Sequence, residues 1–86
     1  MAKYNIIVTA SAEKAIKKLP RDAAFRIVTA IQSLATDPYP AGCRKLSGYE
    51  YIYRIRVQTY RIIYEIHQKI IEIKILKVGH RKDVYR

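Results

Sequence analysis

The hydrophobic period of the chain changes once, at Gly48, and this change limits the folds that the sequence can adopt. Before Gly48, apolar residues recur every three or four positions over 12–19 and 23–35, as on one face of an amphipathic helix. After Gly48 they recur at every second position, and Ile, Val and Tyr dominate, as in half-buried strands. Strands are predicted at residues 51–57, 60–66 and 70–78.

Shorter segments complete the order of elements. Residues 4–9 are rich in β-branched side chains and bounded by small residues, so they predict a first strand. Ser11 is expected to cap the first helix, and Pro20 to end it and to begin the second. The order β-α-α-β-β-β predicts an α+β fold, with an N-terminal helical hairpin on one face of a small sheet. That sheet is expected to be antiparallel, and mixed at the N-terminal strand.

Length and composition narrow the class of protein. With 86 residues, the chain predicts one domain spanning 1–86. No apolar run approaches the ~18 residues that cross a bilayer, the start lacks the apolar core of a signal peptide, and the single cysteine, Cys43, suits a reducing compartment. We therefore expect a cytoplasmic protein without membrane contact. Metal-ligand spacing and a glycine-rich phosphate loop are both missing from the sequence, so no metal and no cofactor are predicted.

The net charge of +10 indicates a polyanionic partner, either a nucleic acid or an acidic protein. Residues 1–43 hold 6 basic and 3 acidic side chains, whereas residues 44–86 hold 11 and 4. The surface that meets the partner is therefore expected mainly in the second half of the chain.

Strand alternation gathers several of these cations on one face of the predicted sheet. A turn at 58–59 sets Arg56 opposite Arg61 and places Arg54 on the same face, and continuing through the second hairpin brings Lys74 near Arg61. Like charges opposed across strands destabilise a sheet, so this pairing is hard to explain by stability alone. Arginine binds phosphate oxygens through a bidentate fork, which makes the face a candidate phosphate-binding surface. The alternative is a solvated basic face without a ligand.

The last nine residues, VGHRKDVYR at 78–86, add further candidates. The segment is expected to leave the sheet at the basic face. His80, Arg81 and Tyr85 would then form one side of a binding site on that face. In RNA cleavage by the 2′-hydroxyl, Arg61 and Arg81 would stabilise the charged phosphate. Tyr85 would stack on a base, or act as a general base if the arginines lower its pKa from about 10. A terminal aromatic side chain that packs on the sheet is the alternative for Tyr85.

Two other reactive side chains are given no role. His67 falls at a predicted turn and is expected to be a solvated loop histidine. Cys43 lies in a loop with no histidine nearby in the sequence, and is expected to be inert. No histidine–glutamate pair is evident, which leaves the general acid and base open.

Motifs at four places resemble, in order and spacing, the RelE branch of the RelE/ParE toxin superfamily: KLSG at 45–48, YRIRV at 53–57, YRIIYEI at 60–66 and VGHRKDVYR at 78–86. The resemblance extends over the whole chain and implies a RelE-like microbial RNase fold. It also implies a toxin of a type II toxin–antitoxin system. RelE-like toxins enter the ribosomal A site, cut the mRNA there by 2′-hydroxyl attack without a metal, and so inhibit translation.

The resemblance implies roles by position. Arg61 and Arg81 match phosphate-stabilising arginines, and Tyr85 matches the C-terminal tyrosine that stacks on or deprotonates the nucleotide. Together with the strand parity, the resemblance predicts RNA contacts at Lys45, Arg54, Arg56, Lys74 and His80. Some relatives carry lysine where this chain has strand arginines, and arginine is a very poor proton donor or acceptor.

The resemblance further implies an acidic, RelB-like antitoxin as partner, with operator DNA bound only through that complex. Two alternatives use the same fold. A ParE-like inhibitor of DNA gyrase would not cleave RNA, and a non-catalytic module would use the basic face only for its partner. ParE-like chains usually lack this terminal tyrosine and full arginine set, so the mRNA endonuclease is the preferred interpretation.

Overall fold

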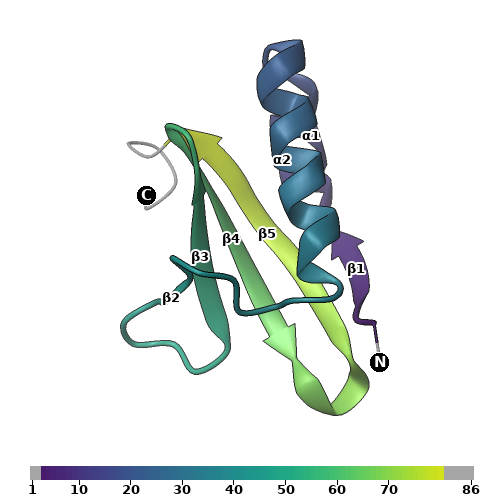
Figure 1. The fold of residues 1–86 in the computed structure, drawn as a ribbon, viewed down its shortest axis with the longest axis vertical. Coiled ribbons are helices and arrows are strands. Elements are labelled where there is room, and N and C mark those ends of the chain that lie inside the picture. The colour runs from purple at the N-terminus through teal and green to yellow at the C-terminus, as the bar shows by residue number, and fades with distance from the viewer. Residues whose placement is uncertain (1–2, 81–86) are drawn as a thin grey trace.

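A computed structural model describes residues 3–80 of the chain. Its elements are β1 (Asn5–Val8), α1 (Ala10–Lys17), α2 (Arg21–Leu34), β2 (Arg44–Lys45), β3 (Ile52–Val57), β4 (Tyr60–His67), the 3₁₀ turn η1 (Gln68–Ile70) and β5 (Glu72–His80). The sheet order is β1-β5-β4-β3-β2; β1 runs parallel to β5, and the other pairs are antiparallel. The predicted α+β fold is thus confirmed, with the short strand β2 added (Figure 1). None of the helices within 3–80 is long and apolar enough to span a membrane.

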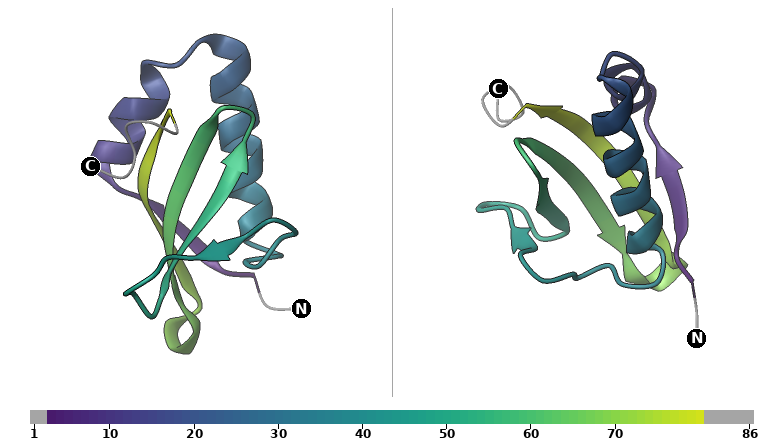
Figure 2. Two further views of the ribbon diagram at one scale, coloured as in Figure 1. Left: turned by 90° about the vertical axis from the view of Figure 1, so that its left-hand side faces the viewer. Right: turned by 45° about the horizontal axis from the view of Figure 1, so that its top comes forward.

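The two helices lie side by side on one face of the sheet, joined by a short connection (Figure 2). The expectation that Ser11 caps α1 is wrong, because the cap is Thr9, whose hydroxyl oxygen accepts a hydrogen bond from the Ala12 amide at 3.2 Å. The same hydroxyl donates to the Leu76 carbonyl at 3.2 Å, so the cap also ties α1 to β5. Pro20 separates the helices as predicted, from the N-cap position of α2.

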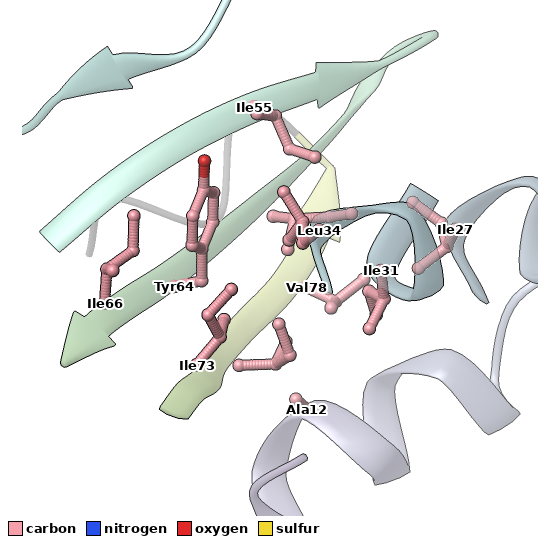
Figure 3. Packing of buried hydrophobic residues seen from close by; sticks show 11 residues of the cluster. Ala12, Ile27, Ile31, Leu34, Ile55, Tyr64, Ile66, Ile73 and Val78 are labelled. Atoms are coloured by element: carbon pink, nitrogen blue, oxygen red, sulfur yellow. The ribbon is translucent and has the colours of Figure 1, made fainter. Parts of the chain in front are cut away.

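The hydrophobic core fills the space between the helical pair and the sheet. Alternate side chains of β3, β4 and β5 meet the apolar stripes of both helices, and Figure 3 shows them converging from separate elements. The buried cluster consists of Ala12, Ile27, Ile31, Leu34, Ile55, Ile62, Tyr64, Ile66, Ile73, Ile75 and Val78. One face of β3, β4 and β5 packs against this core. Because side chains alternate along a strand, this packing fixes which side chains lie on the other face.

The turn between β3 and β4 has the predicted register. Val57 pairs with Tyr60, and Arg56 therefore pairs with Arg61. Gln58, the first turn residue, has a φ of 57°, in the left-handed region that favours glycine. The tight connection therefore places a strained glutamine at the end of the hairpin.

Replacing Gln58 with glycine is expected to raise the free energy of unfolding by roughly 0.5–1 kcal/mol. Relief of the left-handed strain, about 1–2 kcal/mol, exceeds the extra entropy of glycine in the unfolded chain. Urea unfolding measures the change. Thr59→Gly is the matched control, since the φ of Thr59 is not positive, and it should lower stability. A Gln58→Gly variant that is less stable than the wild type would show that the left-handed backbone at Gln58 is not strained.

The pairing of β4 with β5 contains a bulge that the sequence pattern did not predict. Ile63 pairs with Lys77, but the next residue of β4, Tyr64, pairs with Ile75, so Leu76 is the extra residue. Lys74 then lies opposite Glu65, four residues along β4 from Arg61, or roughly 13 Å. The prediction that Lys74 lies near Arg61 is therefore wrong, and Lys77 occupies the place nearer to Arg61.

The last strand also begins later than predicted. Residues 70 and 71 were assigned to it, but Ile70 ends the turn η1, and β5 starts at Glu72. Ile71 has a φ of 52°, and this left-handed backbone turns the chain into β5. At its other end, β5 continues past the predicted boundary to His80.

Candidate nucleic-acid interface

The face of the sheet opposite the helices carries a group of cations, which we call the arginine face: Arg44, Arg54, Arg56, Arg61 and Lys77. Cross-strand pairing brings them together, because Arg44 pairs with Arg54, Arg56 with Arg61, and Lys77 with Ile63 beside Arg54. Alternation places them away from the core, into which Ile55 and Ile62 point. The structure thus confirms the predicted convergence of Arg54, Arg56 and Arg61, and it adds two cations.

Ile63 lies at the centre of the arginine face and is only 5% exposed, although it is outside the main core cluster. Its cross-strand neighbours are Arg54 and Lys77, long side chains whose alkyl stems can cover apolar surface. The Nε atom of Arg54 is shielded from solvent and makes no hydrogen bond within residues 3–80. Because buried donors are normally paired, this side chain is suited to an added acceptor such as a phosphate oxygen.

A small hollow lies at the turn end of the arginine face, between Arg56 and Arg61. Its volume is about 80 Å³, and the turn residues and Tyr60 complete its lining. This is well below the roughly 300 Å³ at which pockets for drug-sized ligands begin, so the hollow suits a single small anionic group. Arg56 and Arg61 pair across the strands and both line the hollow, so an anion bound there would offset the repulsion between their like charges.

Two other predicted RNA contacts lie on the opposite face of the sheet. Lys45 pairs with Tyr53, whose ring stacks against the buried Tyr64 on the helical side, and Lys45 itself is exposed. His80 pairs with Tyr60, and their rings meet edge to face with centroids 6.1 Å apart. The structure therefore places neither side chain with the arginine face, and their RNA contacts stay a prediction.

Arg44 is, with Lys77, one of the two residues of the arginine face that sequence reasoning missed. It belongs to the two-residue strand β2, which is too short to show any periodicity. The only available signal was its position directly before Lys45, in the KLSG motif region. Once paired with β3, Arg44 lies opposite Arg54 and extends the cationic surface to the edge of the sheet.

The remaining predicted residues, Arg81 and Tyr85, lie outside the described residues. Gly79 pairs with Arg61, so the last described strand leads the chain past that arginine. Arg81 follows the end of that strand by one position. The roles of Arg81 and Tyr85 remain predictions.

The far end of β4 holds a histidine–glutamate pair that the sequence did not suggest. His67 was expected to be a solvated loop histidine, but it ends β4, and its Nε2 lies 2.8 Å from the Glu65 carboxylate. The two residues are one pleat apart on the same strand face, which explains the contact. His67 is six residues from Arg61 along β4, or roughly 20 Å, so the pair does not join the arginine face.

Two tyrosines on the helical side have raised pKa values. Tyr64 is fully buried, and its hydroxyl donates to the Pro38 carbonyl at 2.9 Å and lies 3.3 Å from the Cys43 sulfur. Burial, followed by the contact with the Cys43 thiol, raises the pKa of Tyr64 far above its usual value. Burial, followed by the neighbouring Tyr39, raises the pKa of Tyr53. Both hydroxyls therefore stay protonated and serve packing.

Metal ligands do not gather in the part of the chain that the structure describes. No group of three or more His, Cys, Asp or Glu side chains within 3–80 could hold a metal ion. Cys43, which was expected to be inert, packs half-buried against the core beside Tyr64. The cations of the arginine face are of the kind that suits the recognition and charge stabilisation of phosphate.

Comparisons with known proteins agree on one group of relatives. Residues 6–85 match the family model described as "ParE toxin of type II toxin-antitoxin system, parDE". Toxin RelG of Mycobacterium tuberculosis is 33% identical over 87 residues, an alignment that covers 96% of this chain and 97% of that protein. The toxin–antitoxin complex RelBE2 of Mycobacterium tuberculosis superposes with a TM-score of 0.81 at 27% identity, over 96% of this chain and 97% of the matched chain. The archaeal RelE–RelB complex of Pyrococcus horikoshii OT3 superposes with a TM-score of 0.83 at 30% identity, over 95% and 99%.

Proposed function

Because this chain belongs to the RelE/ParE superfamily of toxins from type II toxin–antitoxin systems, we propose that it cuts mRNA in the ribosomal A site and thereby inhibits translation. The observation that carries the proposal is the opposition of Arg56 and Arg61 across β3 and β4. Two guanidinium groups on adjacent strands repel each other, and a bound phosphate removes that repulsion. The repulsion between the two side chains does not itself favour this pairing, whereas a phosphate ligand would.

The proposed chemistry is attack of an RNA 2′-hydroxyl on the adjacent phosphorus. A new P–O2′ bond forms as the P–O5′ bond breaks, which leaves a 2′,3′-cyclic phosphate and a free 5′-hydroxyl. One group must take the 2′ proton, and another must give a proton to the leaving 5′ oxygen. The transition state carries extra negative charge on the phosphate oxygens, which Arg61 and Arg81 would stabilise.

The other residues divide between RNA binding and proton transfer. Arg54 and Arg56, with Arg44, would hold the flanking phosphates along β3. Arginine keeps its proton at any relevant pH, so it does not supply the acid or the base. Tyr85 is the proposed base, and the acid is unassigned.

We also propose an acidic, RelB-like antitoxin as the cytoplasmic partner of this toxin. Two of the matched structures are complexes of RelE-type toxins with their antitoxins. The net charge of +10 would attract an acidic partner at a high rate of association. Operator DNA, in this proposal, is bound only by the complex.

Primer extension on a defined mRNA, with and without ribosomes, tests the proposed activity. The wild type is expected to produce cuts at A-site codons only when ribosomes are present, and Arg81→Ala should lose them. An Arg21→Ala variant, which removes an exposed charge at the start of α2, is the control and should cut like the wild type.

A second candidate function is inhibition of DNA gyrase, because the matching family model describes a ParE toxin. It predicts a different result in the same experiment. No cuts under any condition, together with loss of supercoiling by purified gyrase, would replace the proposed RNA cleavage with this activity.

A further inference from the structure

A pocket of about 470 Å³ lies at the end of β3 and β4 that is remote from the Gln58 turn. In Figure 1 this end of the sheet is at the bottom, where β3 begins and the neighbouring β4 ends. Three tyrosines and a histidine contribute to its walls: Tyr39, Tyr51, Tyr53 and His67. We propose that this pocket binds one nucleobase of an RNA chain whose phosphates lie on the arginine face, an inference that rests on the proposed function.

The walls of the pocket are held in place by contacts that reach the core. The Tyr53 ring stacks on the buried Tyr64 at 6.1 Å and meets the Tyr39 ring edge to face at 5.3 Å. The Gln68 side-chain amide donates to the Tyr39 hydroxyl at 2.6 Å, which ties the turn after β4 to the loop near residue 39. A pocket that is already formed loses little conformational entropy when a ligand binds.

The chemistry of the walls fits a flat aromatic ligand better than a phosphate. Tyr51 and His67 present rings whose centroids are 6.3 Å apart and whose planes are tilted by 33°. Every base has a π-face that stacks on such rings. Glu50 and Lys69 also line the pocket, and their opposite charges leave it without the positive excess of the arginine face.

The position of the pocket relates it to the arginine face. Both are built on β3 and β4, and Arg61 and His67 are six residues apart on β4, or roughly 20 Å. His67 shares the strand face of Arg61, whereas Tyr53 and Ile66 belong to the helical side, so a single strand lying along the arginines would reach the pocket by passing the end of β4. Recognition of single-stranded RNA combines a cationic track with aromatic stacking in this way. The pocket would therefore read a base a few nucleotides away from the cut rather than take part in the cleavage.

Nucleosides provide the direct test, because they carry a base but no phosphate for the arginine face. Adenosine, guanosine, cytidine and uridine are titrated into the full-length protein at millimolar concentrations, and the backbone amide signals of Gln68 and Lys69 are followed by NMR. At least one nucleoside should shift these signals. Tyr51→Ala should weaken its binding by roughly tenfold or more, the loss expected for one stacking partner.

Tyr49→Ala is the matched control. Tyr49 and Tyr51 are each 57% exposed and lie two residues apart, but only Tyr51 lines the pocket. The inference is overturned if no nucleoside shifts the signals, or if the two variants weaken binding equally. It is also overturned if Tyr51→Ala weakens binding of the antitoxin instead, since the pocket would then hold a side chain of a protein partner.

Cleavage assays on the same proteins separate this inference from the proposed function. If the wild type cuts mRNA, Tyr51→Ala should change the base preference a few nucleotides away from the cut while Tyr49→Ala does not. Cleavage without nucleoside binding overturns the pocket alone. Nucleoside binding without cleavage supports the pocket as a base-binding site and overturns the endonuclease.

Discussion

Replacing Arg61 with alanine is expected to slow mRNA cleavage by about 10²–10³-fold, the effect typical of removing one positioned donor to a charged transition state. Arg61 is half-buried on the arginine face, between Arg56 on β3 and Gly79 on β5. Its guanidinium group lies where the hollow at the turn would hold a phosphate. Single-turnover primer extension on ribosomes measures the rate.

The same variant should not unfold the protein. Arg61→Ala removes the repulsion with Arg56 and leaves the hydrophobic core unchanged, so the variant should still unfold in a single cooperative urea transition. Arg61→Lys keeps the charge but loses the bidentate fork, and should cleave at an intermediate rate. Arg26→Ala, on α2 and exposed, removes the same charge from the helical side and should leave the rate unchanged. Equal rate losses in Arg61→Ala and Arg26→Ala would mean that Arg61 acts only through the net charge of the protein.

Replacing Ile62 with alanine is expected to lower the free energy of unfolding by about 2–5 kcal/mol. Ile62 is the residue after Arg61 on β4, but its side chain points into the core and is 0% exposed. The loss combines the transfer energy of the removed methyl and methylene groups with the cavity that they leave. For a domain whose total stability is about 5–15 kcal/mol, this is a large fraction.

Urea unfolding followed by circular dichroism measures the change, and Ile70→Ala is the matched control. Ile70 is the same residue type in the turn after β4, but it is 62% exposed, so its replacement should cost less than about 0.5 kcal/mol. A similar loss in both variants would show that burial at Ile62 does not decide stability. The Arg61 and Ile62 variants together separate activity from stability at neighbouring positions of one strand.

The register of the arginine pair could be predicted because two constraints agreed. The alternation in 51–57 and 60–66 fixed the core face of each strand, and a two-residue connection fixed how the strands align. Arg56 opposite Arg61 follows from these constraints without any tertiary information.

The misplacement of Lys74 has a physical cause in the turn after β4. The sequence pattern started the last strand at residue 70, whereas β5 starts at Glu72. The later start shifts the register, so Lys74 lies opposite Glu65 and not near Arg61. The bulge lies beyond Lys74 and shifts the rest of β5 by one further residue, which nothing in the residue type of Leu76 indicates, because leucine also fits a regular strand.

Other features depend on tertiary contacts that no local pattern encodes. Arg44 joins the arginine face only through the two-residue strand β2, and the Glu65–His67 pair forms because β4 extends one residue past its predicted end. The Tyr51 pocket needs the loop around residue 39 to fold back on the turn after β4. The Thr9 cap, by contrast, is a local contact with the Ala12 amide, and it was missed because Ser11 is also a favoured capping residue type.

The pairing of β1 with β5 also limits when the chain can complete its fold during synthesis. The parallel pair joins β1 to β5, so it cannot form until residues 72–80 have been synthesised. Contacts of such long sequence separation also form late in folding, since the loop that they close is long. Lys77 reaches its place on the arginine face through the same strand. A nascent chain therefore lacks a complete arginine face until β5 has been made and has paired with β4.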